Sequence, residues 1–189
     1  TCVQTNLTAV PPDGTKIAFA SLLRSGLSSI FTMNPDGSGL TRLTGGVEFD
    51  YTPSWSPDGT HIAFSSGLSI FSQHIAVIDA DGTHKTVLTK GLSIDSAPSW
   101  SPDGNLILFA STRTGFGDIY VMSTTGTDIT RLTHDNDADS TPAWSRSGDR
   151  ISYTRYRQGN ADVYLMDADG SNVSRLTTGS GFDGEASWK

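Results

Sequence analysis

The chain contains little from which a disulfide framework or a membrane anchor could be built. Its single cysteine, Cys2, excludes an intrachain disulfide and leaves the redox compartment undetermined. No apolar run approaches the roughly 18 residues that a membrane-spanning helix needs, so membrane insertion is not expected. The first residues also lack the basic and apolar regions of a signal peptide, so we expect a mature chain or one that is not exported by that route.

Charge is scarce as well. Only 17% of the 189 residues are charged, which is low for a soluble domain, and the 20 acidic residues outnumber the 13 lysines and arginines to give a net charge of −7. Because a negative surface repels phosphate groups, nucleic acid is not an expected partner, whereas cations or a basic protein surface are. The length allows one sizeable core rather than two domains.

A helical period is also absent, because no stretch sustains an apolar residue every 3.6 positions. One phrase is instead repeated along the chain. The sequence Pro53–Gly59 returns at Pro98–Gly104 and, eroded, at Pro142–Gly148, and Ala186–Trp188 repeats its centre. The phrase carries a tryptophan each time, at Trp55, Trp100, Trp144 and Trp188. A near-constant interval of 44–45 residues predicts an array of units that stack on their neighbours.

Each unit has the pattern strand, turn, strand, turn, strand, turn, strand. After Trp55 the residues Ser56–Gly59 form a turn signal, and they lead into the apolar, β-prone segment 62–65. Four antiparallel strands per unit are typical of a β-propeller blade, so we expect an all-β propeller with almost no helix. The repeats are expected at about 5–49, 50–94, 95–138 and 139–182, with 183–189 as a closing or donated strand.

The last repeat of the phrase bears on how the propeller closes. An unpaired edge strand is a template for pairing, and propellers commonly complete one blade with strands from both termini. We therefore predict that Glu185–Trp188 is paired and that Trp188 is buried like the other tryptophans. The expected partner is the blade that begins near Val10, within one chain or between two.

The repeated tryptophans allow two interpretations. They could form a ring on which a ligand stacks, or they could fill the wedge between neighbouring sheets. Their place inside strand-forming phrases favours inter-blade packing for Trp55, Trp100, Trp144 and Trp188.

The most regular polar feature is an aspartate five residues before each tryptophan, at Asp50, Asp95, Asp139 and Asp183. If the tryptophans mark the innermost strands, these carboxylates recur around the rim of the central channel. Such a ring would bind Ca²⁺ or the basic end of a partner peptide. The alternative is that each aspartate caps a loop by accepting backbone N–H bonds, which is the more common use.

Other motifs that could carry chemistry are weak. Asp135, Asp137 and Asp139 alternate as in calcium loops but lack the glycine and the distal glutamate of an EF-hand loop, so they are only a candidate metal site. Gly179–Gly184 fits a dinucleotide-binding pattern but follows a strand and precedes no helix. The four histidines fall at unrelated positions of the repeat, and no catalytic motif is present, so no catalytic residue is predicted.

The repeated Trp-Ser-Pro-Asp-Gly, Ile-Ala-Phe, Ile-Tyr-Val-Met and Arg-Leu-Thr elements resemble the WD40-like repeat of the TolB type, also called PD40, over nearly the whole chain. The resemblance implies an extracytoplasmic β-propeller, periplasmic or extracellular, that acts as a protein-interaction platform. We accordingly expect a non-enzymatic scaffold without a cofactor, Ca²⁺ being the one candidate, that binds a protein partner or self-associates through its terminal strands. The alternative is a propeller that supports or carries hydrolase or polysaccharide-lyase activity.

Overall fold

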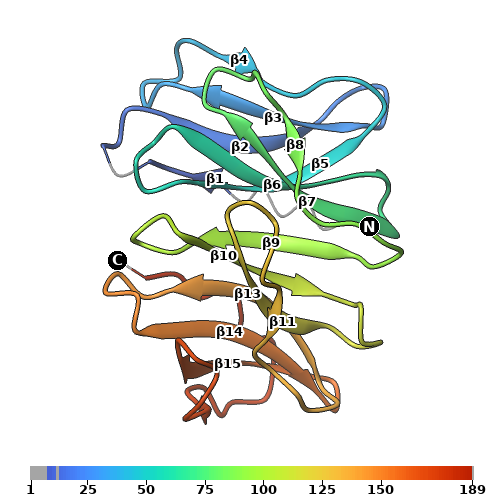
Figure 1. The fold of residues 1–189 in the computed structure, drawn as a ribbon, viewed down its shortest axis with the longest axis vertical. Helices are drawn as coiled ribbons and strands as arrows, with labels where there is room; N and C mark the ends of the chain where they lie inside the picture. Colours follow the sequence, from blue (N-terminus) through green and yellow to red (C-terminus); the bar gives the residue numbers. More distant parts are fainter. Residues whose placement is uncertain (1–7, 12, 189) are drawn as a thin grey trace.

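The computed structural model describes residues 8–11 and 13–188, and all regular structure in this part of the chain is β. Its strands form four antiparallel sheets of four strands each, and every sheet is built from four consecutive strands. The predicted all-β propeller of four-stranded blades is therefore confirmed. Figure 1 shows the blades stacked in chain order, from the blue first blade at the top to the red fourth blade at the bottom.

The blades have the following strands. The first blade comprises β1 (Thr8–Ala9), β2 (Ile17–Leu22), β3 (Ser28–Met33) and β4 (Thr41–Arg42). The second comprises β5 (Phe49–Trp55), β6 (His61–Ser69), β7 (Ser72–Asp79) and β8 (Thr86–Val87). The third comprises β9 (Asp95–Trp100), β10 (Leu106–Ser111), β11 (Asp118–Ser123) and β12 (Thr130–Arg131). The fourth comprises β13 (Ala138–Trp144), β14 (Arg150–Arg157), β15 (Asn160–Asp167) and β16 (Ser174–Arg175).

The first strands of the second, third and fourth blades contain a bulge at the same position. Pairing of β5 with β6 shifts between Tyr51 and Ser54, and Thr52 has a φ of 51° there. Ala97 and Thr141 occupy the same place in β9 and β13, with φ of 50° and 48°. A β-bulge bends the strand and changes the direction of the following side chains. The bulge thus belongs to the repeat and sets the path of each first strand.

Neighbouring blades pack through the tryptophan at the end of each first strand. Trp55 joins a core cluster with Ala18 of the preceding blade, and Trp144 joins one with Leu108. Trp100 packs against the cluster that contains Ala63. Each ring therefore lies on the second strand of the blade before it.

A second contact between blades depends on glycine. Gly126 has a φ of +80°, and a Cβ at this position would lie 2.7 Å from the carbonyl oxygen of Leu88 in the preceding blade. Gly82 and Gly170 approach the carbonyl oxygens of Leu43 and Leu132 in the same way. The turn between third and fourth strands therefore sits directly against the Leu-Thr pair of the previous blade.

The four blades form an open arc in the described part of the chain. Contacts join each blade to the next, and no comparable contact joins strands of the first and fourth blades. Within the described chain Glu185–Trp188 does not pair with the first blade, whereas pairing of this segment between two chains stays a prediction. Glu185 N donates to Thr154 Oγ1 at 3.1 Å, and Trp188 is 42% exposed, because this segment lies against the fourth blade and the described chain has no further strand to cover it.

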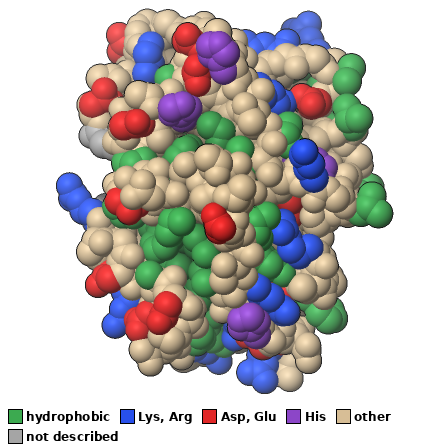
Figure 2. Space-filling view, in the orientation of Figure 1, with side chains coloured by type: hydrophobic (Ala, Val, Ile, Leu, Met, Phe, Trp, Pro, Cys, Tyr) green, Lys and Arg blue, Asp and Glu red, His purple; other side chains and the backbone are tan. Residues whose placement is uncertain are grey.

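The two ends of the strands form two different faces. We call the end with the turns between first and second and between third and fourth strands the turn face, and the opposite end the loop face. In Figure 2 red acidic side chains recur along the left edge, where the turn face lies, and green hydrophobic side chains protrude along the right edge. The exposed hydrophobic residues of the loop face include Val47, Leu68, Ile70, Phe71, Leu92 and Phe116.

Candidate functional site

The aspartates that open the first strands are buried, and each faces a cation. Asp50, Asp95 and Asp139 are 1%, 0% and 1% exposed. Arg155 donates to Asp139 from Nε at 2.7 Å and from Nη2 at 2.9 Å. Arg113 Nη2 donates to Asp95 at 3.2 Å, and Lys85 Nζ lies 3.6 Å from Asp50 Oδ1. Burial raises the pKa of Asp139, and the hydrogen bonds from Arg155 oppose that shift.

Each of these cations also lies over an aromatic ring of its own blade. The Arg155 guanidinium is 4.8 Å from the ring centroid of Tyr164, and that of Arg113 is 4.8 Å from the ring centroid of Tyr120. Lys85 Nζ is 5.3 Å from the Phe64 centroid. A cation held between a carboxylate and an aromatic face is thus a recurrent structural element of this propeller.

The expected acidic ring at the channel rim is therefore corrected. Residues 52–54, 97–99, 141–143 and 185–187 line a central cavity of about 190 Å³, and none of the four aspartates is among them. Asp183 keeps the register of Asp139, because its N–H donates to Ala161 O as that of Asp139 donates to Gly117 O. The carboxylates of Asp50, Asp95 and Asp139 are instead buried in the blades, where Lys85, Arg113 and Arg155 face them.

The candidate metal site at Asp135, Asp137 and Asp139 is corrected for the same reason. Arg155 pairs with both Asp135 and Asp139, while Asp137 faces Arg157 at 3.6 Å. Within the described residues no group of three or more His, Cys, Asp or Glu side chains is arranged to hold a metal ion. The alternating carboxylates bind guanidinium groups instead.

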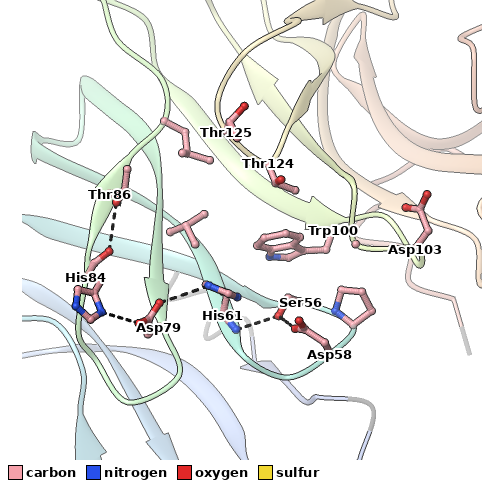
Figure 3. A pocket seen from close by; sticks show the side chains of 14 residues that line it. Ser56, Asp58, His61, Asp79, His84, Thr86, Trp100, Asp103, Thr124 and Thr125 are labelled. Carbon is pink, nitrogen blue, oxygen red and sulfur yellow. Dashed lines mark hydrogen bonds and ion pairs between the residues drawn. The ribbon is translucent and has the colours of Figure 1, made fainter.

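A cavity opens on the turn face between the second and third blades. It measures about 600 Å³ and is lined by Ser56, Pro57, Asp58, His61, Val77, Asp79, His84, Thr86, Leu88, Trp100, Asp103, Gly104, Thr124 and Thr125. We call it the blade 2–3 pocket. In Figure 3 the Trp100 ring lies at the centre, with Thr124 on one side and His61 and Ser56 on the other. Trp100 is partly exposed here, whereas Trp55 and Trp144 are 9% and 8% exposed at the neighbouring junctions.

Negative charge dominates the pocket at neutral pH. Ser56 Oγ donates to Asp58 Oδ1 at 2.5 Å and Thr60 N donates at 3.0 Å, which together lower the pKa of Asp58 to about 2. Asp103 has a lowered pKa through the same contacts, made by Ser101 and Asn105. Among the lining residues there is no lysine or arginine.

Two histidines share Asp79. His84 Nδ1 lies 2.8 Å from Asp79 Oδ2, and His61 Nε2 lies 3.5 Å from Asp79 Oδ1. The hydrogen bond to Asp79 raises the pKa of His84. His61 opens β6 and Asp79 ends β7, so hairpin register brings them together. That register was the signal by which sequence reasoning could have found the cluster.

The His61–Asp79 pair has counterparts in other blades. Arg150 and Asp167 form an ion pair at the equivalent cross-strand position, and Lys16 Nζ donates to Asn34 there at 2.7 Å. His61 is thus a member of a recurring cross-strand pair, and His84 is the addition in the second blade.

The remaining expectations concern other parts of the chain: Cys2 lies outside the described residues, and residues 179–184 precede no helix. Within residues 8–11 and 13–188 no helix has the length and apolarity to cross a membrane.

Comparison with known proteins identifies the repeat. Residues 69–157 match the family model described as the TolB β-propeller domain, PD40. No curated protein sequence matches the chain at a significant level. Among solved structures, TolB of Agrobacterium tumefaciens is 30% identical with a TM-score of 0.83, over 90% of this chain and 64% of that one.

Other solved structures extend the comparison. TolB of Acinetobacter baumannii is 25% identical with a TM-score of 0.79, over 90% of this chain and 42% of that one. A puromycin-hydrolysing peptidase of Mycobacterium tuberculosis is 17% identical with a TM-score of 0.76, over 95% of this chain and 32% of that one, which shows a shared fold alone. The chain spans less than two thirds of the length of the TolB structures. Residues 69–157 thus belong to the TolB β-propeller (PD40) family, and the described chain as a whole has the fold of TolB-type propellers.

Proposed function

We propose that this chain is a non-enzymatic, extracytoplasmic propeller module that binds a protein with a basic surface and serves as an assembly scaffold. The observation that carries the proposal is the segregation of charge onto the turn face. The basic residues of the turn face are Lys16, Arg146 and Arg150. Lys85 also belongs to one of its turns, but its side chain is directed to Asp50 and Glu48. The acidic residues are Asp13, Asp36, Asp58, Asp79, Asp81, Asp103, Asp128, Asp149, Asp167 and Asp169.

The turn geometry keeps much of this charge ionised and in place. Asp36 accepts hydrogen bonds from the backbone N–H and the hydroxyl of Ser38, and Asp81 accepts the same pair from Thr83. These bonds lower the pKa of both carboxyl groups. A fixed field of one sign accelerates encounter with an oppositely charged surface and orients it. The similarity to TolB propellers supports both the scaffold role and a location outside the cytoplasm.

A peptide-display selection with the intact chain tests the proposal. We expect enrichment of Lys- and Arg-containing peptides whose binding weakens with salt. The triple variant Asp36→Asn, Asp81→Asn, Asp169→Asn keeps the turn hydrogen-bond acceptors and should lose most of that binding. The matched control, Glu48→Gln, Asp137→Asn, Asp183→Asn, removes the same charge from the loop face and should retain it. Equal loss in both variants would refute a role for the turn face.

An alternative function is support of hydrolysis or polysaccharide lysis. The similarity in fold to a mycobacterial peptidase and the His61–Asp79–His84 cluster favour testing it. A screen of peptidase, esterase and polysaccharide substrates separates the two functions, with His61→Gln as the diagnostic variant. Turnover by the wild-type chain that disappears in this variant would favour the hydrolase or lyase function over the scaffold. Light scattering would show whether the partner is a second copy joined through the terminal strands.

A further inference from the structure

The protein contains an internal pattern for how it holds a cation. In three blades an aromatic face and a carboxylate together take a cation: Tyr164 and Asp139 hold Arg155, and Tyr120 and Asp95 hold Arg113. Phe64 and Asp50 face Lys85 in the second blade. In each case the cation belongs to the same blade and fills the space between the two groups.

The blade 2–3 pocket has the same components without a lysine or arginine among its lining residues. Trp100 supplies a partly exposed indole, and Asp58 and Asp79 supply carboxylates from the adjoining turn and strand end. Asp79 is 36% exposed at its side chain, and its oxygens face His84 Nδ1 at 2.8 Å and His61 Nε2 at 3.5 Å. The ring centroids of His61 and Trp100 are 6.4 Å apart, so an incoming guanidinium competes with the His61 imidazole for Asp79. Figure 3 shows both carboxylates on the same side of the Trp100 ring as His61.

We infer that the blade 2–3 pocket is a recognition site for an arginine side chain of the partner protein, which rests on the proposed scaffold function and names its chemistry. The planar guanidinium stacks on the indole of Trp100 and donates to the Asp79 carboxylate. Asp58 adds fixed negative charge on the same side of the ring. The cavity of about 600 Å³ accommodates this side chain together with neighbouring backbone.

The test follows the indole N–H signal of Trp100 by NMR at about pH 8.5. The probe is Nα-acetyl-arginine amide, and the matched control is the citrulline analogue, which has the same shape and no charge. Trp100→Phe assigns the signal. We expect a saturable shift with the arginine derivative, little shift with citrulline, and no saturable shift at Trp55 or Trp144.

Two variants locate the contact. Asp79→Asn should weaken binding about fivefold or more, because it removes the charge-assisted hydrogen bonds. Asp149→Asn removes an acidic side chain of the turn face that does not line the pocket. It should alter binding less than about twofold. Equal weakening by both, or equal shifts with arginine and citrulline, would overturn the assignment.

The outcomes also separate this inference from the proposed function. In one outcome, basic peptides bind, the turn-face triple variant loses this binding, and the arginine derivative leaves the Trp100 signal unchanged. This outcome supports binding by the acidic turn face and refutes the arginine pocket. If the derivative binds at Trp100 and no peptide is selected, the arginine pocket is supported and the scaffold role is refuted.

Discussion

Trp188 Nε1 donates a hydrogen bond to Ser152 Oγ at 3.0 Å. Ser152 occupies the second-strand position at which Ala18, Ala63 and Leu108 meet the tryptophans of the preceding junctions. Glu185 also has a φ of 57°, matching the bulge residues Thr52, Ala97 and Thr141. The terminal segment therefore repeats the backbone conformation and the inter-blade contact of a first strand, although it lies outside any described sheet.

A double-mutant cycle of Trp188→Phe and Ser152→Ala should show a coupling energy of about 1 kcal/mol in urea unfolding, because it removes one hydrogen bond. Ser152→Ala should not disturb packing, because the second blade has an alanine, Ala63, at the equivalent position. Trp55→Phe is the comparison, because Trp55 Nε1 has no hydrogen-bond partner among the described residues. Zero coupling would mean that Trp188 does not hold the terminal segment.

The glycine contact between blades gives a second prediction. Gly126→Ala should destabilise the chain by about 1–3 kcal/mol more than Gly115→Ala. Both glycines have positive φ, so both variants share the backbone strain, but a Cβ at Gly115 meets nothing within 4 Å. Thermal unfolding measures the difference. Similar losses would show that blade packing tolerates the extra methyl group by shifting.

Removal of the Arg155 guanidinium should be costly. Arg155→Met leaves the buried Asp139 without its bidentate partner and should lower the free energy of unfolding by about 3–5 kcal/mol. Arg157→Met, at a side chain that is 62% exposed, should cost less than about 1 kcal/mol. Because the pKa of Asp139 is already raised by burial, Arg155→Met should recover stability as the pH falls and Asp139 becomes neutral. A pH-independent deficit would contradict this explanation.

Asp58 should contribute to stability in a defined pH window. Its folded-state pKa of about 2 lies below the ordinary value of 3.8, so its contribution is complete above about pH 4 and is lost as the pH falls through 2. The difference in unfolding free energy between wild type and Asp58→Asn should therefore shrink over that range. It should stay below about 1 kcal/mol, because the side chain is exposed and screened. A difference that persists at about pH 2 would mean that packing, not charge, is responsible.

Calcium should leave the melting temperature unchanged. A ligand that binds only the folded state raises stability by about 2.7 kcal/mol at a hundredfold excess over its dissociation constant. The carboxylates of Asp95 and Asp139 are already paired with arginines, which leaves no compensation for displacing them. Calorimetry in EDTA and then in millimolar Ca²⁺ measures this. A rise in midpoint that is lost in Asp139→Asn would restore the metal hypothesis.

The sequence by itself determined the repeat, the blade and the absence of helix, because turn residues and β-prone segments act locally and recur in register. It could also predict the inter-blade tryptophans, since a large ring at a fixed place in each unit must lie between sheets. It did not determine where Asp50, Asp95 and Asp139 point. That depended on Lys85, Arg113 and Arg155, which occupy different positions in their units and reach the carboxylates only through strand pairing and twist.

The blade 2–3 pocket was decided by tertiary structure for the same reason. Hairpin register brings His61 and Asp79 together within the second blade, but Trp100 belongs to the third blade and reaches them only through blade packing. The placement of Trp188 likewise depended on the contact that Ser152 of β14 offers on the fourth blade. Local propensity specifies each strand, whereas burial and charge pairing between distant strands decide which side chains meet.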